Sequence, residues 1–433
     1  MRKILLSCLL IVVGFAAQAQ WSTSPSVNTR ITTALQPQHD PKVLPDGNGG
    51  AFISYEDSRS FSDDIYIQRI NSSGIMQWQA NGLPICTAPF YQSEQFMLPD
   101  DTGGVYVIWR DERISGLSKI YAQHLNPDGT SQWATNGMLV MTGANLVFDL
   151  NIASNNTGGA IIVWSSQADT QSTMHAQSVN AAGDLSWGIS GVPISTFKGS
   201  FIEAVPDGNG GAYLAWLDDR ASITYSNSYV QHIASDGIVQ WQDNGLATKL
   251  STLNQQWQEI IADGSGGAFV TFAEWVTGNH TITYSQQLNS TGLAWANSVV
   301  VTTGQGWQYS SSMALNNSGG IIVAWSDQRN EGDVYAQNIC STGALGNCVL
   351  GLPEITSDSM LSVYPNPSDG NFTVTSLGIL DRIIVTDVLG KVIFSIVPAS
   401  EETTIALPDA NSGIYFAKLV SGNREVVKKL IFK

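Results

Sequence analysis

The chain has 433 residues, only 13% of them charged, and a formal net charge of −16. Residues 361–433 hold seven acidic and seven basic side chains, so the rest of the chain carries the whole negative excess. A strongly acidic domain repels phosphate groups, which argues against nucleic acid and anionic membranes as partners.

Residues 1–19 are predicted to be a secretory signal peptide. Arg2 and Lys3 precede an apolar run that ends at Phe15, and residues 17–19 have the small-x-small pattern of a cleavage site. No later segment has about 18 consecutive apolar residues, so we expect no transmembrane segment. The expected product is a monomer that crosses the periplasm and is secreted or held at the cell surface.

Residues 20–352 contain six copies of one unit. A turn of the pattern Asp/Asn-x-x-Gly-Gly recurs every 52 to 56 residues, with its second glycine at Gly50, Gly104, Gly159, Gly211, Gly267 and Gly320. Further markers keep the same register: Gln68, Gln123, Gln177, Gln231, Gln286 and Gln337, then Trp78, Trp133, Trp187, Trp241 and Trp295. Each unit reads as four short strands, the fourth starting at the tryptophan. Such a period predicts a propeller blade.

The two ends of the repeat region complement each other. The sixth copy lacks a tryptophan strand, whereas the chain opens with an unpaired one, Trp21 followed by VNTRITTA. Pairing these two would leave no free edge between the first and last blades. The predicted fold is therefore all-β: a six-bladed β-propeller closed by its N-terminal strand, followed by a small C-terminal β-domain.

Most repeated residues are interpreted as structural. The glycines allow positive φ in tight turns, the tryptophans fill the space between blades, and the glutamines bond the backbone between strands. An acid and an arginine two residues apart recur at the end of the second strand in four copies. We expect them to pair and hold the following loop. The pairs are Asp57 with Arg59, Asp111 with Arg113, Asp218 or Asp219 with Arg220, and Asp327 with Arg329.

The innermost strands begin with an acid in five copies: Asp40, Glu94, Asp149, Glu203 and Glu259. The first three lie ten residues before the second glycine of the turn and the last two lie eight before it, so strand alternation predicts one shared side. In a ring they would meet at the mouth of the central channel. They could bind Ca²⁺ there, or they could merely solvate the mouth. No other cofactor is expected.

Three cysteines remain after removal of the signal peptide. Cys340 and Cys348 flank a short turn and can form a disulfide in an oxidising compartment. Cys86 has no evident partner and is expected to be a buried small hydrophobic residue.

After a linker at residues 353–361, residues 362–433 form the C-terminal domain. Its sequence includes VYPNPSDGNF, IIVTDVLGKVIF and LPDANSGIYFAKLVSGNREVVKKLIFK. These stretches resemble the type A C-terminal sorting domain of the type IX secretion system in Bacteroidota. The resemblance implies an Ig-like β-sandwich and the outer-membrane secretion machinery as a partner. It also implies recognition elements at Tyr364, Pro365, Asn366, Pro367, Gly390, Lys391, Gly413, Tyr415, Lys428 and Lys429.

Function is less well determined than architecture. The histidines are scattered, no catalytic motif is present, and the loops between strands are short. We therefore favour a non-catalytic module that binds a polysaccharide or a surface protein. Two alternatives stay open. One is a glycan hydrolase or lyase that uses acids on one propeller face, and the other is a structural surface-layer or adhesion protein.

Overall fold

The computed structural model describes residues 21, 26, 28–348 and 361–433, apart from positions 115, 143–145, 169–170, 223, 278–279, 304–305, 331, 377, 409 and 422–423. The chain divides into two compact units, Met1–Cys348 and Val349–Lys433. The predicted signal peptide lies outside the described residues, as does the predicted linker except for its last residue. Among the described residues no helix is long and apolar enough to span a bilayer.

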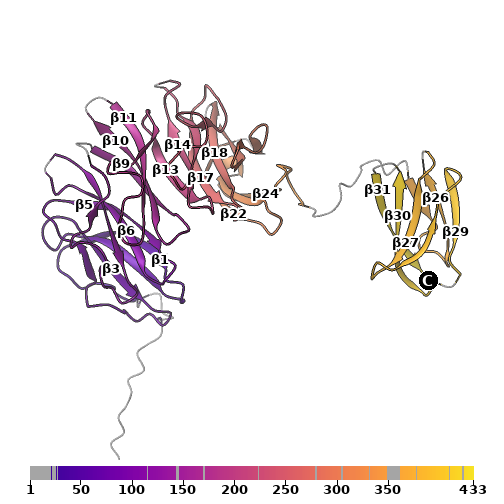
Figure 1. Cartoon of the computed structure of the whole chain (residues 1–433), viewed down its shortest axis with the longest axis horizontal. Helices are drawn as coiled ribbons and strands as arrows, with labels where there is room; N and C mark the ends of the chain where they lie inside the picture. The colour runs from indigo at the N-terminus through magenta and orange to yellow at the C-terminus, as the bar shows by residue number, and fades with distance from the viewer. Residues whose placement is uncertain are drawn as a thin grey trace, which may run out of the picture. The chain divides into compact units, whose positions relative to one another are not determined.

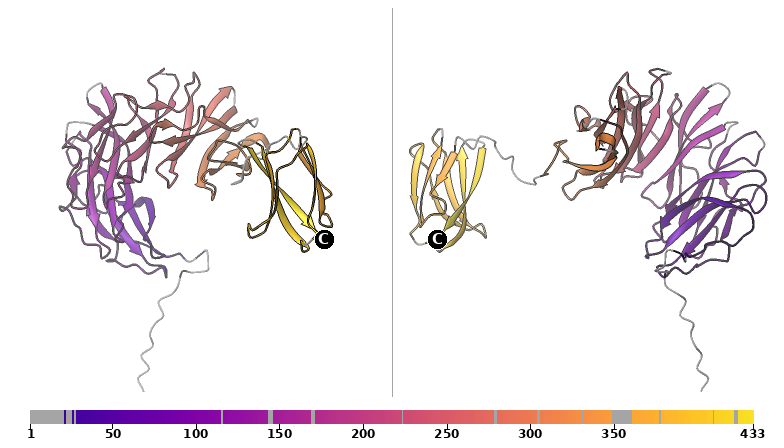
Figure 2. Two further views of the ribbon diagram at one scale, coloured as in Figure 1. Left: turned by 45° about the vertical axis from the view of Figure 1, so that its right-hand side comes forward. Right: turned by 180° about the vertical axis from the view of Figure 1, so that it is seen from behind.

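The N-terminal unit is made of six antiparallel sheets that follow one another in chain order (Figures 1 and 2). The first two contain β1 (Gln38–Pro45), β2 (Ala51–Asp57), β3 (Asp64–Ile70) and β4 (Leu83–Cys86), then β5 (Gln92–Pro99), β6 (Val105–Asp111), β7 (Lys119–Leu125) and β8 (Met138–Leu139). The third and fourth contain β9 (Leu146–Ser154), β10 (Ala160–Ala168), β11 (Gln171–Val179) and β12 (Val192–Ser195), then β13 (Ser200–Pro206), β14 (Ala212–Asp218), β15 (Asn227–Ile233) and β16 (Leu246–Ala247).

The fifth sheet contains β17 (Gln255–Ala262), β18 (Ala268–Thr277), β19 (His280–Asn289), β20 (Gly292–Leu293) and β21 (Val299–Thr302). The sixth contains β22 (Gln308–Leu315), β23 (Ile321–Asp327) and β24 (Asp333–Ile339), with the 3-10 turn η1 (Gln328–Asn330) between the last two. The first strand of each sheet packs against the first strand of the next. These sheets have the strand arrangement of propeller blades, and the predicted all-β fold is confirmed.

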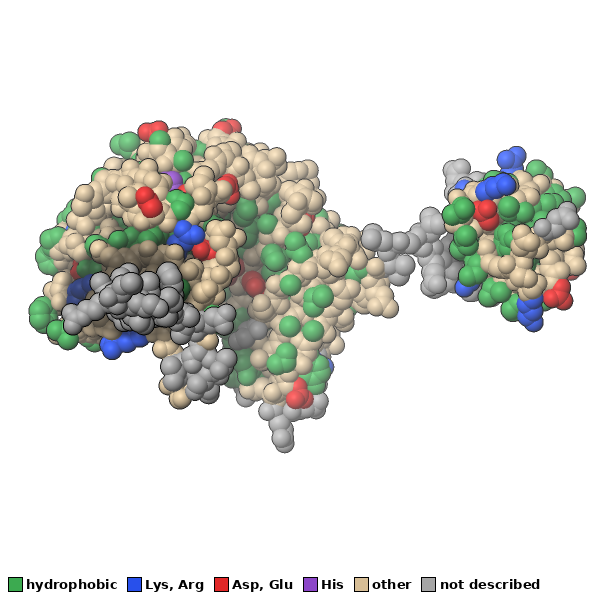
Figure 3. Space-filling model, turned by 90° about the horizontal axis from the view of Figure 1, so that it is seen from below, with side chains coloured by type: hydrophobic (Ala, Val, Ile, Leu, Met, Phe, Trp, Pro, Cys, Tyr) green, Lys and Arg blue, Asp and Glu red, His purple; other side chains and the backbone are tan. Residues whose placement is uncertain are grey.

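The middle strands of the inner sheets in the row are buried on both faces because a neighbouring sheet covers each side, whereas β23 and β24 of the sixth sheet are partly exposed. All seven residues of β14 are buried, and Trp216 at its centre has no exposed surface. Charged side chains are few on the surface of this unit in the view of Figure 3, where backbone and uncharged polar atoms dominate. Apolar packing between neighbouring sheets is therefore a main source of stability in this unit.

The two glycines of each repeated turn have different roles, and our prediction was wrong for the second. The first has a positive φ, for example 93° at Gly210. At the second, Gly211, an added Cβ would lie 2.1 Å from the carbonyl oxygen of Ile233. The second glycine is therefore required because the neighbouring strand leaves no room for a side chain, and not because of its φ.

The repeated tryptophans lie between sheets and tie each one to the next. Trp187, for example, donates its indole N–H to the carbonyl of Ser235 in the following sheet, at 3.0 Å. The tryptophans precede the fourth strands and do not start them, since β12 begins only at Val192. Each glutamine bonds the backbone: Gln177 Oε1 accepts from the N–H of Trp187.

The N-terminal segment docks on the first sheet as the end of a preceding blade would. Trp21 donates its indole N–H to the carbonyl of Ser72, and the Thr33 N–H donates to Asn81 Oδ1 at 2.7 Å. Thr87 and Thr196, which follow β4 and β12, bond asparagines of the next sheet in the same way.

The predicted pairing of this segment with the sixth sheet is not found among the described residues. That sheet has three strands, β22-β23-β24. In the other sheets the fourth strand follows the third closely in sequence. Residues 28–34 and β24 are instead separated by roughly 300 residues, and this separation raises the entropic cost of bringing them together.

The C-terminal unit is a β-sandwich, as predicted. One sheet contains β25 (Leu361–Tyr364), β26 (Asn371–Ser376) and β29 (Glu402–Ala406). The other contains β28 (Val392–Ile396), β27 (Arg382–Asp387), β30 (Gly413–Ser421) and β31 (Arg424–Phe432). Alternate residues of both sheets, such as Phe372, Ile383 and Ala417, form one buried core.

Candidate functional site

The first strand of every sheet contains a β-bulge at the same place. The register with the second strand shifts between His39 and Lys42 in the first sheet, and at the equivalent position in the other five. A non-glycine residue with positive φ occupies five of these bulges, at angles of 41° to 55°: Asp40, Glu94, Asp149, Phe201 and Trp257. Bulges commonly re-aim a side chain beside a binding site, and bulky residues rarely adopt this conformation.

This bulge corrects the predicted arrangement of the acids. Our prediction placed all five on one side by simple alternation, but alternation does not hold across a bulge. Asp40, Glu94 and Asp149 occupy the bulge itself, whereas Glu203 and Glu259 lie two residues beyond it. The two sets are therefore not equivalent positions.

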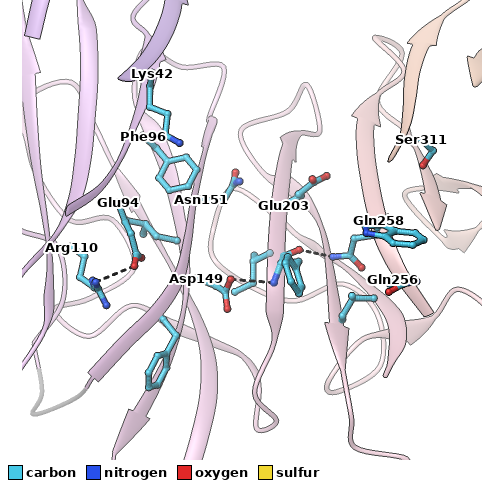
Figure 4. A pocket seen from close by; sticks show the side chains of 16 residues that line it. Lys42, Glu94, Phe96, Arg110, Asp149, Asn151, Glu203, Gln256, Gln258 and Ser311 are labelled. Atoms are coloured by element: carbon cyan, nitrogen blue, oxygen red, sulfur yellow. Dashed lines mark hydrogen bonds and ion pairs between the residues drawn. The ribbon is translucent and has the colours of Figure 1, made fainter. Parts of the chain in front are cut away.

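A cavity of about 750 Å³ lies along these bulges, and its wall includes residues from the first strands of all six sheets, from Lys42 on β1 to Ser311 on β22 (Figure 4). Three of the predicted acids line it: Glu94, Asp149 and Glu203. Aromatic rings and side-chain amides also line the cavity: Phe148, Phe201, Trp257, Asn151, Gln256 and Gln258.

The backbone of Phe201 is held from both neighbouring sheets. Its N–H donates to Asp149 Oδ1 at 3.2 Å, and its carbonyl accepts from Gln258 Nε2 at 2.6 Å (Figure 4). These bonds keep Phe201 in its left-handed conformation, while 70% of the residue remains exposed. Backbone strain of this kind persists only where surrounding structure enforces it, and it often accompanies function.

Burial changes the acidity of the two carboxyl groups at the centre of the wall. It raises the pKa of Glu203 to about 7, against the opposing effect of the Ile260 N–H that donates to Oε2 at 2.8 Å. Burial also raises the pKa of Asp149, opposed by the Phe201 N–H and by Lys198. Near neutral pH the Glu203 carboxyl can therefore both donate and accept a hydrogen bond.

Aromatic packing extends the cavity wall toward the sixth sheet. The ring of Trp257 lies 6.4 Å from Trp307 and 6.2 Å from Tyr309, measured between centroids. Sequence reasoning missed Phe201 and Trp257 because it looked only for acids. The signal was present, since both lie ten residues before the second glycine of their turns, as Asp40, Glu94 and Asp149 do.

Asp40 lies elsewhere, in a cluster at the end of the first sheet. His39 Nδ1 is 3.0 Å from Asp40 Oδ2 and 3.6 Å from Glu56 Oε2, and Nε2 is 3.2 Å from Asp63 Oδ1. The bond to Asp40 is the main cause that raises the pKa of His39, which favours the imidazolium form. Within the described residues, His39, Glu56 and Asp63 have ligand atoms close enough together to hold a metal ion. Asp40 does not belong to that group, and the five predicted acids form no such group.

The acid–arginine pairs lie away from the cavity wall and hold loops. Asp111 is fully buried and accepts from Trp109 Nε1 at 2.8 Å and from Arg113 Nη2 at 2.6 Å. Arg113 also donates to the carbonyl of Asn136 and stacks 3.5 Å over the ring of Tyr121. The same ion pair joins Asp57 with Arg59, Asp218 with Arg220, and Asp327 with Arg329.

The fifth sheet has an ion pair at the equivalent position, made of different residues. Glu274 occupies the position of the aspartate, and its partner is Lys249, which follows the fourth strand of the preceding sheet. The Lys249 ammonium lies 4.7 Å from the ring centroid of Tyr284. Sequence reasoning found no pair in this copy because the cation comes from outside the local motif.

The cysteines occupy separate places in the N-terminal unit. Cys340 and Cys348 are joined by a disulfide, with their Cα atoms 5.2 Å apart. Cys86 is free and buried beside Asp111, and burial raises the pKa of its thiol to about 12. A thiol in this state is unreactive near neutral pH.

In the C-terminal sandwich several of the predicted recognition elements contact the terminal strand. Asn366, between Tyr364-Pro365 and Pro367, donates from Nδ2 to the carbonyl of Lys429 and accepts from the N–H of Ile431. Tyr415 packs on Phe432, with 4.8 Å between ring centroids. Gly390 forms the hairpin turn after β27 with a φ of 81°, directly before Lys391, and Gly413 begins β30 beside Phe432. Lys428 and Lys429 lie on the strand that Asn366 holds.

Residues 362–433 match the family described as "Secretion system C-terminal sorting domain". This region is thus a C-terminal sorting domain of the type IX secretion system, joined to a β-rich domain of repeated sheets. The chain is secreted or attached to the cell surface, and its sorting domain interacts with the secretion machinery.

No curated protein sequence matches this chain. A crystal structure of a protein of unknown function from Dyadobacter fermentans is similar over 71% of this chain and 95% of that one, with 10% identity and a TM-score of 0.39. A polysaccharide lyase described as an ulvan lyase is similar over 92% and 97%, with 11% identity and a TM-score of 0.44. The endo-arabinase from Bacteroides thetaiotaomicron is similar over 57% of this chain and 93% of that one, with 10% identity and a TM-score of 0.29. These scores carry no inference about what this chain binds.

Proposed function

We propose that the N-terminal unit is a non-catalytic polysaccharide-binding module, which the sorting domain delivers to the outside of the cell. The observation that carries this proposal is the cavity along the bulged first strands, where aromatic rings lie beside amides and carboxyl groups. Aromatic faces pack against the C–H faces of sugar rings, while amides and carboxyl groups bond their hydroxyls.

Binding to immobilised and soluble polysaccharides tests this proposal. The full chain and its Trp257→Ala variant are compared by isothermal titration calorimetry and by retention on insoluble glycans. We expect the variant to bind at least tenfold more weakly because it removes the largest aromatic face of the wall. Ile238→Ala, at an exposed turn residue that does not line the cavity, is the matched control and should bind normally. Equal binding by all three proteins would contradict the proposed site.

A second candidate function is glycan cleavage by a hydrolase or lyase. The observation that favours it is Glu203, whose pKa of about 7 suits a general acid working near neutral pH. The test measures release of reducing ends and of unsaturated products from the polysaccharides that bind. Activity that is present in the full chain and lost in Glu203→Gln would establish an enzyme, and binding without turnover would favour the module.

A further inference from the structure

The charged side chains around the cavity are unevenly paired. Glu94 and Arg110 form an ion pair, with 3.1 Å between Oε1 and Nη2. Asp149 and Glu203 instead accept backbone N–H groups of the next sheet. Besides Arg110, the basic group among the described lining residues is Lys42, on β1. The middle of the wall, where β9 and β13 meet, therefore presents carboxyl groups to an entering ligand.

Glu203 has an acidic neighbour and Asp149 a basic one, while the domain as a whole is acidic. Glu259 acts on Glu203, and the cation that acts on Asp149 is Lys198, whose ammonium lies 4.8 Å from the ring centroid of Phe148. The N-terminal region as a whole has 11 Lys and Arg between residues 21 and 352 and carries the chain's entire negative excess. A domain field of this sign disfavours the approach of polyanions.

On the basis of the proposed function, we infer that the cavity selects uncharged polysaccharides over those that carry carboxylate or sulfate groups. Above pH 7, where Glu203 is mostly ionised, an anionic sugar unit beside Asp149 and Glu203 would place like charges together in a partly buried site, where water and salt screen them less. Binding is therefore compared at pH 8. An uncharged unit offers hydroxyls to the same two groups and packs its C–H faces on Phe201 and Trp257. The ligand class is a chain of neutral hexose or pentose units.

The first experiment measures binding of the full chain to two sets of hexasaccharides by titration calorimetry. The uncharged set is built from glucose, mannose, galactose, xylose or arabinose, and the anionic set contains hexagalacturonate and a chondroitin sulfate hexasaccharide. We expect at least one uncharged ligand to bind tenfold more tightly than either anionic one. Tighter binding of an anionic ligand would overturn this inference and leave the proposed function standing. Binding of neither set would overturn both.

A charge-neutral variant tests the cause of the selectivity. In the double variant Asp149→Asn, Glu203→Gln, each new side chain keeps an oxygen that can accept the backbone N–H, so the sheets stay tied. We expect the ratio of hexagalacturonate affinity to uncharged-ligand affinity to rise at least tenfold. Asp236→Asn, in an exposed turn, removes one charge away from the cavity and should leave the ratio unchanged. An unchanged ratio in the double variant would overturn the charge argument.

Salt provides a second readout that needs no variant. Raising NaCl from about 20 mM to about 500 mM screens repulsion, so hexagalacturonate should bind the unmodified chain at least threefold more tightly while uncharged ligands change little. Weaker hexagalacturonate binding at high salt would mean that the cavity attracts anions, and it would overturn the inference.

Discussion

The bulge of each first strand, which we call the inner position, and the recurring residues elsewhere in the repeat, which we call the outer positions, repeat in different ways. At the outer positions the side chains themselves recur: the glycine pair, the glutamine, the tryptophan and, in four sheets, the acid–arginine pair. At the inner bulge the backbone recurs while the side chain changes from acid to aromatic, as Asp149 and Phe201 show. A side chain that recurs in every sheet packs or forms hydrogen bonds that the fold needs. A side chain that varies on a constant backbone is available for contact with a ligand.

The largest effects are expected at the outer positions, beginning with the acid–arginine pair. Asp111→Ala leaves the buried Trp109 indole N–H without its acceptor and the half-buried Arg113 guanidinium without its counter-charge, which should cost about 3 kcal/mol. The free energy of unfolding is measured by denaturant titration, with Asp236→Ala as the exposed control. A loss below about 1 kcal/mol would break the distinction between outer and inner positions.

The repeated turn contains glycines with different roles. Gly211→Ala forces a Cβ against the carbonyl of Ile233 and should cost about 3 kcal/mol or more. Gly208, in the same turn but outside the glycine pair, has a φ of 81° and open space around it, so Gly208→Ala should cost only about 1–2 kcal/mol of backbone strain. The comparison uses thermal unfolding of both variants. Equal costs would contradict close approach as the reason for the second glycine.

The raised pKa of Glu203 predicts that the stability of the chain depends on pH. Because the pKa of Glu203 in the folded chain, about 7, lies above its ordinary value of 4.5, the stability it contributes is full below pH 4.5 and is lost as pH rises through 7. Glu203→Gln should reduce this pH-dependent loss by on the order of 1–2 kcal/mol. Denaturant midpoints at several pH values between 4.5 and 8 measure it. A pH profile identical to that of the parent chain would contradict the burial of this carboxyl group.

The smallest effect on stability, and the most informative about function, is expected at Phe201. Phe201→Gly relieves the left-handed strain and should be about 1 kcal/mol more stable than Phe201→Ala, which keeps that strain. Both remove the exposed ring, so both should lose glycan binding equally. Unfolding midpoints and binding are compared for the two variants. If Phe201→Gly were the less stable, the bulge would not be strained.

Sequence patterns predicted the parts of the structure that local spacing controls. Gln177 and Trp187 were placed because their register is constant, and the C-terminal sandwich because a specific three-part pattern marks it. The bulge was not predicted, since an extra residue in one strand leaves no mark when the side chain at that position varies from copy to copy. The lysine that replaces arginine in the fifth sheet, Lys249, was missed because its partner Glu274 lies 25 residues away.

The amino-acid sequence by itself determined the repeated unit and the identity of the structural side chains, because these depend on contacts within one repeat or with the next, and it determined the C-terminal sorting domain, because a specific local pattern marks it. Only the tertiary structure decided that Asp149, Phe201 and Trp257 share one wall and that Asp40 does not. Residues about 50 positions apart become neighbours only when sheets pack side by side, and the bulge sets where each side chain then lies.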